Sequence, residues 1–204
     1  KASTGELVWH YQTIHHDIWD WDLPTHPLLV DITTNKGKVP IVIQLGKTGM
    51  VYTFYRETGL PYFEIEERPV ATDGILGDQL SPTQPFPVKP PPLIRQGITP
   101  DDAWGVTPIE REGCREKIAG ARYGGMFTPI STKGTIMYPQ VGGGANWGGG
   151  AFDAERNILV VPVSEVPFYV RLIPKDEVDQ KLAKSPMAGN PMGPPGLIKG
   201  TDYG

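Results

Sequence analysis

The sequence lacks several features that would assign its class immediately. It contains a single cysteine, Cys114, so an internal disulfide is impossible and cysteine usage says nothing about the redox compartment. No apolar run reaches the ~18 residues that a membrane-spanning helix requires. The net charge is only −4, which gives no reason to expect nucleic acid or an anionic membrane surface as a partner.

Glycine and proline, by contrast, are abundant, with 25 and 22 residues among 204. They are spread among β-branched and aromatic runs, which is typical of a folded chain with many turns. Helical periodicity is weak, and the best candidate helix covers residues 175–183. The composition therefore predicts an all-β fold with long loops.

Two runs rich in β-branched and aromatic residues, 39–45 and 50–56, flank the turn Gly46-Lys47-Thr48-Gly49 and predict a β-hairpin. A polar turn at residues 153–157 predicts a second hairpin. Further strands are expected at residues 134–138, 151–152, 158–163 and 168–173.

Two proline-rich stretches, residues 68–100 and 185–204, predict long loops, because proline cannot donate to a strand ladder. The pair Thr4-Gly5 recurs as Thr58-Gly59. Repeats of about 40–50 residues with several short strands each are typical of propeller blades. Residues 1–204 show no internal domain boundary, and we expect them to be an excerpt of a longer polypeptide.

Residues 15–22 (His-His-Asp-Ile-Trp-Asp-Trp-Asp) combine imidazoles, indoles and carboxylates. A strand would place His16 and Asp20 on one face and Trp19 and Trp21 on the other. One interpretation is a capped turn whose tryptophans pack in a core. Another is a functional carboxylate, either a general base with a pKa raised by the neighbouring rings or an oxygen ligand for a hard cation such as calcium.

Two further segments are candidates for binding. Lys47 is either a solvated turn lysine or a functional cation, and the surrounding turn lacks the glycine spacing of a phosphate loop. Residues 142–150 place Asn146 and Trp147 among six glycines. Glycine would let the backbone approach a flat ligand closely, and the Asn146 amide offers both a donor and an acceptor.

Together and in this order, these segments resemble the pyrroloquinoline-quinone (PQQ) dependent sugar and alcohol dehydrogenases over nearly the whole chain. The resemblance implies an eight-bladed quinoprotein β-propeller, of which 204 residues would form roughly four blades. It begins at Trp9, which follows Thr4-Gly5 as in the motif that docks neighbouring blades. The other matching segments are residues 15–20, 46–49, 114–115, 122–123, 127–129, 133–135 and 146–149.

The resemblance also implies site residues and cofactors. Asp20 matches the general base that takes the substrate's hydroxyl proton while hydride passes to the quinone, and in some members it approaches a bound calcium ion. Lys47 matches a basic residue that hydrogen-bonds the quinone oxygens, and lysine there is typical of the glucose and polyol branch. Asn146 matches an amide that contacts the cofactor, and Trp147 follows it in the same loop. The implied cofactors are PQQ and calcium.

The implied activity is oxidation of a sugar, polyol or alcohol in the periplasm, with ubiquinone or a cytochrome as electron acceptor. Any inner-membrane anchor would lie outside this chain. The family's other calcium ligands and its ring-stacking tryptophan precede the matched region, so we expect the isolated fragment to be inactive. The alternative is a non-catalytic PQQ-repeat propeller that acts as a binding or assembly scaffold. Convergence of Asp20, Lys47, Asn146 and Trp147 on one site would favour the enzyme.

Overall fold

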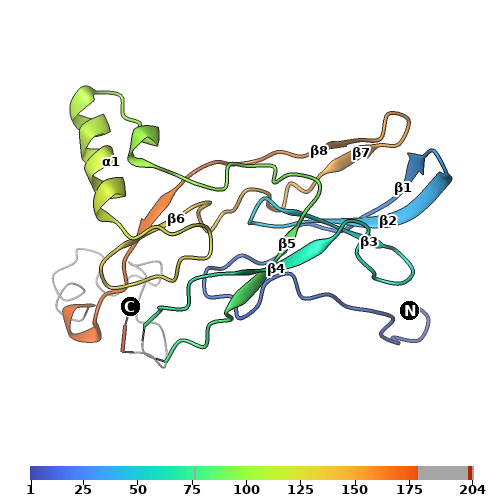
Figure 1. Cartoon of the computed structure of the whole chain (residues 1–204), viewed down its shortest axis with the longest axis horizontal. Helices are drawn as coiled ribbons and strands as arrows, with labels where there is room; N and C mark the ends of the chain where they lie inside the picture. Colours follow the sequence, from blue (N-terminus) through green and yellow to red (C-terminus); the bar gives the residue numbers. More distant parts are fainter. Residues whose placement is uncertain (76, 179–201, 204) are drawn as a thin grey trace.

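The fold is described from a computed structural model that covers residues 1–75, 77–178 and 202–203. These residues form mostly β-structure, with small antiparallel sheets arranged along the long axis of the molecule (Figure 1). The helix α1 stands at one end and the sheet β1-β2-β3 at the other. The prediction of a β-protein is confirmed, with one substantial helix as a correction.

The largest sheet contains β1 (Leu28–Thr34), β2 (Gly37–Leu45) and β3 (Val51–Tyr55) in that order. The predicted hairpin is confirmed, since β2 and β3 pair antiparallel from Ile41 opposite Tyr55 to Leu45 opposite Val51. Strand β1 was not predicted. A two-residue turn joins β1 to β2. The side chains of β1 alternate between half-buried and exposed positions, and this alternation is the signal from which the strand could have been predicted.

Strands β4 (Ile65–Pro69) and β5 (Thr83–Pro87) correct the prediction of a continuous loop over residues 68–100. The backbone bonds from Val88 to Glu64 and from Val70 to Pro82 fix the phase of this ladder. Because bonded and non-bonded pairs alternate in antiparallel strands, Pro69, Pro85 and Pro87 all fall in non-bonded pairs. A proline there loses no ladder bond, so this strand pair tolerates all three.

The two remaining sheets are short. Strand β7 (Ala151–Asp153) pairs with β8 (Ile158–Val160), which confirms the second predicted hairpin. Strand β6 (Thr135–Met137) pairs with β9 (Phe168–Val170), at two of the other predicted positions. Strand β7 is one residue longer than predicted, whereas β6, β8 and β9 are shorter than predicted.

Helix α1 (Pro108–Gly120) follows the short 3-10 turn η1 (Pro100–Asp102) and was not predicted. The Thr107 hydroxyl accepts from the Glu110 amide, and the Glu110 carboxylate accepts from the Thr107 amide, which forms a capping box. Ile118 is the one buried residue of this helix, so an amphipathic pattern was absent from the sequence. Of the predicted helix 175–183, residues 175–178 are helical, and the remainder lies outside the described residues.

The two Thr-Gly pairs form the same turn. The amide of Gly5 donates to Lys1 O at 2.8 Å and that of Gly59 to Tyr55 O at 2.9 Å, and both glycines have φ of +71°. This matching geometry supports the predicted repeat. The predicted loop at residues 185–204 lies outside the described residues except for Asp202 and Tyr203.

Trp9 links the first turn to the second. Its Nε1 donates to Arg56 O at 3.0 Å, and its ring lies 5.7 Å from that of Phe54. The indole also packs on Gly59. The tryptophan of one repeat is therefore docked on the turn of the next, as expected from the motif.

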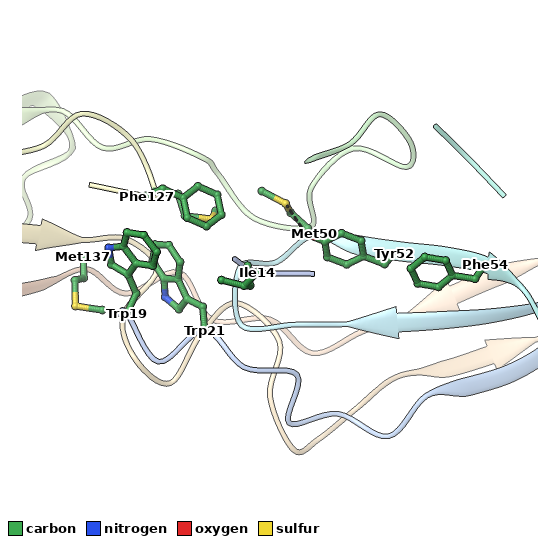
Figure 2. Packing of buried hydrophobic residues seen from close by; sticks show 9 residues of the cluster. Ile14, Trp19, Trp21, Met50, Tyr52, Phe54, Phe127 and Met137 are labelled. Carbon is green, nitrogen blue, oxygen red and sulfur yellow. Dashed lines mark hydrogen bonds between the residues drawn. The ribbon is translucent and has the colours of Figure 1, made fainter. Parts of the chain in front are cut away.

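The main hydrophobic core lies between the N-terminal segment and β3 (Figure 2). Trp19 and Trp21 are stacked with centroids 5.5 Å apart, and Phe127 meets both edge-on. Tyr52 and Phe54 in β3, and Met50 immediately before it, extend the cluster. A second core covers the opposite face of β2 and is formed by Ile41, Ile43, Leu45, Val51 and Ala145.

Candidate functional site

Residues 15–22 form an irregular turn and not a strand. Sides still alternate over residues 19–22, because Trp19 and Trp21 are buried whereas Asp20 and Asp22 are exposed and both contact Lys47. The carboxylate of Asp17 accepts from the backbone amides of Trp19 at 2.8 Å and Trp21 at 2.7 Å. His16 and Asp20 have φ of 46° and 64°, in the left-handed region that aspartate tolerates better than most residues. The turn is therefore built by one capping carboxylate and two unusual backbone conformations.

The two tryptophans anchor this turn in the core. Trp19 is 2% exposed and donates from Nε1 to Thr128 O at 2.8 Å, and Trp21 is fully buried. Asp20 lies between them in sequence, yet its side chain is 67% exposed. The interpretation as a capped turn with buried tryptophans is confirmed. The expected desolvation of Asp20 by the indoles is not observed.

Lys47 brings this turn together with the β2–β3 connection. Its Nζ lies 2.8 Å from Asp20 Oδ2 and 2.6 Å from Asp22 Oδ1, although Lys47 and Asp20 are 27 residues apart. Lys47 is only 8% exposed, so the interpretation as a solvated turn lysine is wrong. Partial burial lowers the pKa of Lys47, but the two carboxylates outweigh that effect and raise it, which keeps the ammonium charged at neutral pH.

The glycine-rich loop packs against the backbone of Lys47. The amide of Gly144 donates to Lys47 O at 2.6 Å. A Cβ added to Gly143 would lie 2.5 Å from Lys47 Cα, so only glycine fits there. These glycines were expected to let the backbone approach a flat ligand closely. In the structure, the backbone that they approach is that of Lys47.

Asn146 and Trp147 lie within this loop. Asn146 Nδ2 donates to Gly142 O at 2.6 Å, and its Oδ1 accepts from the Trp147 amide at 2.8 Å. The amide of Asn146 thus shapes its own loop. The Trp147 side chain projects into solvent with 84% exposure.

The structure therefore unites Asp20 and Lys47 directly and places the loop of Asn146 and Trp147 beside them through its glycines. Asp22 was not selected from the sequence as a site residue. Its position two residues after Asp20, in a run with three carboxylates, was the signal that could have identified it.

Comparison with known proteins identifies the family of this chain. The β-propeller domain family of PQQ-dependent glucose, ethanol and alcohol dehydrogenases matches residues 1–201. The chain belongs to this PQQ dehydrogenase family. It is 37% identical over 207 residues to a quinoprotein glucose dehydrogenase of Escherichia coli strain K12, covering 98% of this chain and 24% of that protein.

Two other relatives of this PQQ dehydrogenase chain act on different alcohols by name. A glycerol dehydrogenase large subunit of Gluconobacter thailandicus is 37% identical, covering 87% of this chain and 24% of that protein. A quinate/shikimate dehydrogenase (quinone) of Acinetobacter baylyi is 35% identical, covering 89% and 22%. The chain thus spans about a quarter of the length of these relatives.

The residues around Lys47 fit part of a PQQ site. Reduced quinone oxygens carry negative charge, which a buried ammonium stabilises, and Lys47 provides one. The exposed carboxylates of Asp20 and Asp22 provide oxygen atoms on the solvent side of that cation. Lys47, with Asp20 and Asp22 beside it, is therefore the part of this chain whose chemistry fits a reduced quinone.

The same residues do not complete a calcium site. Calcium takes about 6–8 oxygen ligands. Within the described residues, no group of three or more histidine, cysteine, aspartate or glutamate side chains is arranged to hold a metal ion. Asp20 and Asp22 already share Lys47, so they could contribute at most a minority of the ligands.

No helix in the described part of this PQQ dehydrogenase chain is long and apolar enough to cross a membrane.

Proposed function

We propose that the full-length protein carrying this chain is a PQQ-dependent dehydrogenase that oxidises a sugar or polyol hydroxyl. The contact between Asp20 and Lys47 is the observation that carries the proposal, because it joins a proton acceptor and a cation from distant segments at 2.8 Å. The names of the relatives support the substrate class, since glucose, glycerol and quinate all carry secondary hydroxyl groups.

In this proposal Asp20 is the general base. Its Oδ2 contacts Lys47, and its Oδ1 is assigned to accept the proton of the substrate hydroxyl. The 67% exposure of its side chain leaves room for a substrate to approach. PQQ, when bound, accepts the hydride from the substrate carbon.

Lys47 has the electrostatic role. Its ammonium, held by two carboxylates, is assigned to hydrogen-bond the quinone oxygens as negative charge develops on them. Asn146 and Trp147 are assigned to cofactor contact as part of the loop that packs on Lys47. Calcium, with Asp20 as one ligand, belongs to the same proposal, with the other ligands supplied by parts of the protein outside this chain.

We further assign the electrons to ubiquinone or a cytochrome and the protein to the periplasm. The word quinone in the names of two quinate dehydrogenases among the relatives supports the first assignment. The isolated chain is expected to be inactive, because it spans only about a quarter of the relatives' length.

The test is reconstitution of the full-length protein with PQQ and calcium, followed by dye reduction with aldoses, polyols, quinate and simple alcohols. Turnover that requires PQQ and is highest with a sugar or polyol is the expected result. Failure of every alcohol to reduce the dye in the PQQ-loaded protein would contradict the proposal. It would favour the non-catalytic scaffold instead.

A further inference from the structure

Gln84, in the β4–β5 sheet, binds the first residue of the turn at residues 15–22, which contains Asp20. It lies in β5, is fully buried, and is 69 residues from His15 in sequence. Its Nε2 donates to His15 O at 2.7 Å, and its Oε1 accepts from the His15 amide at 2.8 Å. One side-chain amide thus satisfies both backbone groups of His15, as a neighbouring strand residue would.

Further contacts fix the same segment beside Gln84. The hydroxyl of Tyr52 donates to Pro85 O at 2.9 Å and lies 3.2 Å from Thr13 O. Burial raises the pKa of Tyr52, so the hydroxyl stays protonated. His15 Nε2 lies 2.9 Å from Glu67 Oε1 on β4. Arg68 pairs with Gln84 in the β4–β5 ladder. Tyr11 is a further titratable group near Glu67.

From His15 the chain reaches Asp20 in five steps with little freedom. His16 is in the left-handed region, Asp17 caps the amides of Trp19 and Trp21, and Trp19 is bonded to Thr128. These constraints leave the segment between His15 and Asp20 few backbone freedoms with which to absorb a displacement of His15. The hydrogen bonds from Gln84 to His15 connect β5 to the first residue of this segment.

We infer that Gln84 is a positioning residue for the reaction: its buried amide sets the position of the turn that presents Asp20 to Lys47 and to the substrate. This inference rests on the proposed function, in which Asp20 is the general base. It assigns a role to a residue of β5 that is remote in sequence from both Asp20 and Lys47. Because its side chain is fully buried, Gln84 is assigned no direct contact with substrate or cofactor.

The decisive variant is Gln84→Glu in the full-length protein. A protonated glutamic acid can both donate to His15 O and accept from the His15 amide, whereas the ionised form cannot donate. Burial raises the pKa of a carboxyl group introduced here, so its ionisation falls within an accessible pH range. The contact to His15 should then be present at acidic pH and lost at alkaline pH.

We expect kcat of the Gln84→Glu variant, relative to the wild type, to fall on the order of 10- to 100-fold from mildly acidic to mildly alkaline pH, as for a displaced catalytic group. Gln84→Met has similar size but neither hydrogen bond, so its loss should be constant with pH. A stability role alone would lower the unfolding midpoint of both variants without a pH-dependent change in kcat.

Asn157 offers a matched control. Its amide makes the same two bonds, Oδ1 accepting from the Thr33 amide at 3.0 Å and Nδ2 donating to Thr33 O at 2.8 Å. It is exposed in the turn between β7 and β8, and aspartate tolerates its φ of 54°. The ratio of kcat between Asn157→Asp and wild type should not change with pH.

Amide hydrogen exchange provides a readout that needs no cofactor. The amides of His15, Trp19 and Trp21 should exchange faster than wild type in Gln84→Glu at alkaline pH and as in wild type at acidic pH. If the wild-type protein showed no PQQ-dependent turnover, the proposed function would be refuted. The exchange measurement would then test by itself whether Gln84 fixes the turn at residues 15–22. An active wild type with a pH-independent Gln84→Glu ratio, or with unchanged kcat in Gln84→Met, would overturn the inference.

Discussion

Trp9 packs directly on Gly59, so closely that a Cβ on that glycine would lie 2.4 Å from the indole Cδ2. The two residues belong to successive Thr-Gly repeats, and Gly59 has φ of +71°. Glycine is thus favoured here for two reasons: the backbone is left-handed, and the Trp9 indole leaves no room for a Cβ. This contact connects one repeat to the next.

Gly59→Ala should therefore destabilise the protein by about 2–4 kcal/mol, since overpacking adds to the backbone cost. Gly5→Ala is the matched control, because Gly5 has the same φ and nothing within 4 Å of an added Cβ. It should lose only the backbone part, about 1–2 kcal/mol. Urea unfolding of both variants measures the difference, and equal losses would show that the Trp9 contact contributes nothing.

The sequence was most informative where local chemistry determines structure. The β2–β3 hairpin follows from β-branched runs around a glycine turn, and the capped turn at residues 15–22 follows from Asp17 and two large indoles. That Asp20 and Lys47 lie in one region was expected through the family resemblance, but their direct ion pair was not predicted. No local pattern relates two residues 27 positions apart.

The errors have physical causes as well. Strand β5 was missed because proline content was judged without the phase of the ladder, which only the pairing with β4 defines. Helix α1 was missed because its capping box, and not an apolar face, marks its start. Gln84 could not be selected, since a buried glutamine in a strand has no sequence pattern that reveals its partner.

Glu67 should give the protein an acid-sensitive component of stability. Burial raises the pKa of Glu67, but the hydrogen bonds from His15 and Thr83 and the charge of His15 together hold it below its ordinary value of 4.5. A lowered folded-state pKa contributes stability that is present above pH 4.5 and lost as the pH falls through the folded value.

Glu67→Gln should remove that component, which is at most ~1 kcal/mol because the side chain is 48% exposed. Thr83→Val removes one of the two hydrogen bonds and should remove part of it. Urea unfolding at several pH values between neutral and acidic measures how the free energy of unfolding changes with pH. An unchanged slope in Glu67→Gln would show that the interaction with His15 is not formed in solution.

Lys47→Met should weaken PQQ binding by about 10- to 100-fold, since the charged hydrogen bond that we propose between Lys47 and the quinone would be lost. The variant also leaves Asp20 and Asp22 without the cation that they share. Lys47→Arg keeps the charge and should bind PQQ more tightly than Lys47→Met does. Lys36→Met, at an exposed position of the β1–β2 turn, is the surface control. A PQQ titration separates these cases, and wild-type affinity in Lys47→Met would exclude Lys47 from the cofactor site.

Asp20→Asn tests the general base with little structural disturbance, because asparagine also tolerates the left-handed φ of 64° at this position. Turnover at saturating PQQ should fall by about 10²–10⁴-fold, the usual contribution of positioned acid–base catalysis. Asp22→Asn is the matched control, since its carboxylate lies 2.6 Å from the same Nζ of Lys47 but is not assigned to the proton. If only the interaction with Lys47 mattered, the two variants would lose similar activity. Steady-state dye reduction at saturating PQQ distinguishes these outcomes, and near wild-type turnover in Asp20→Asn would exclude Asp20 as the general base.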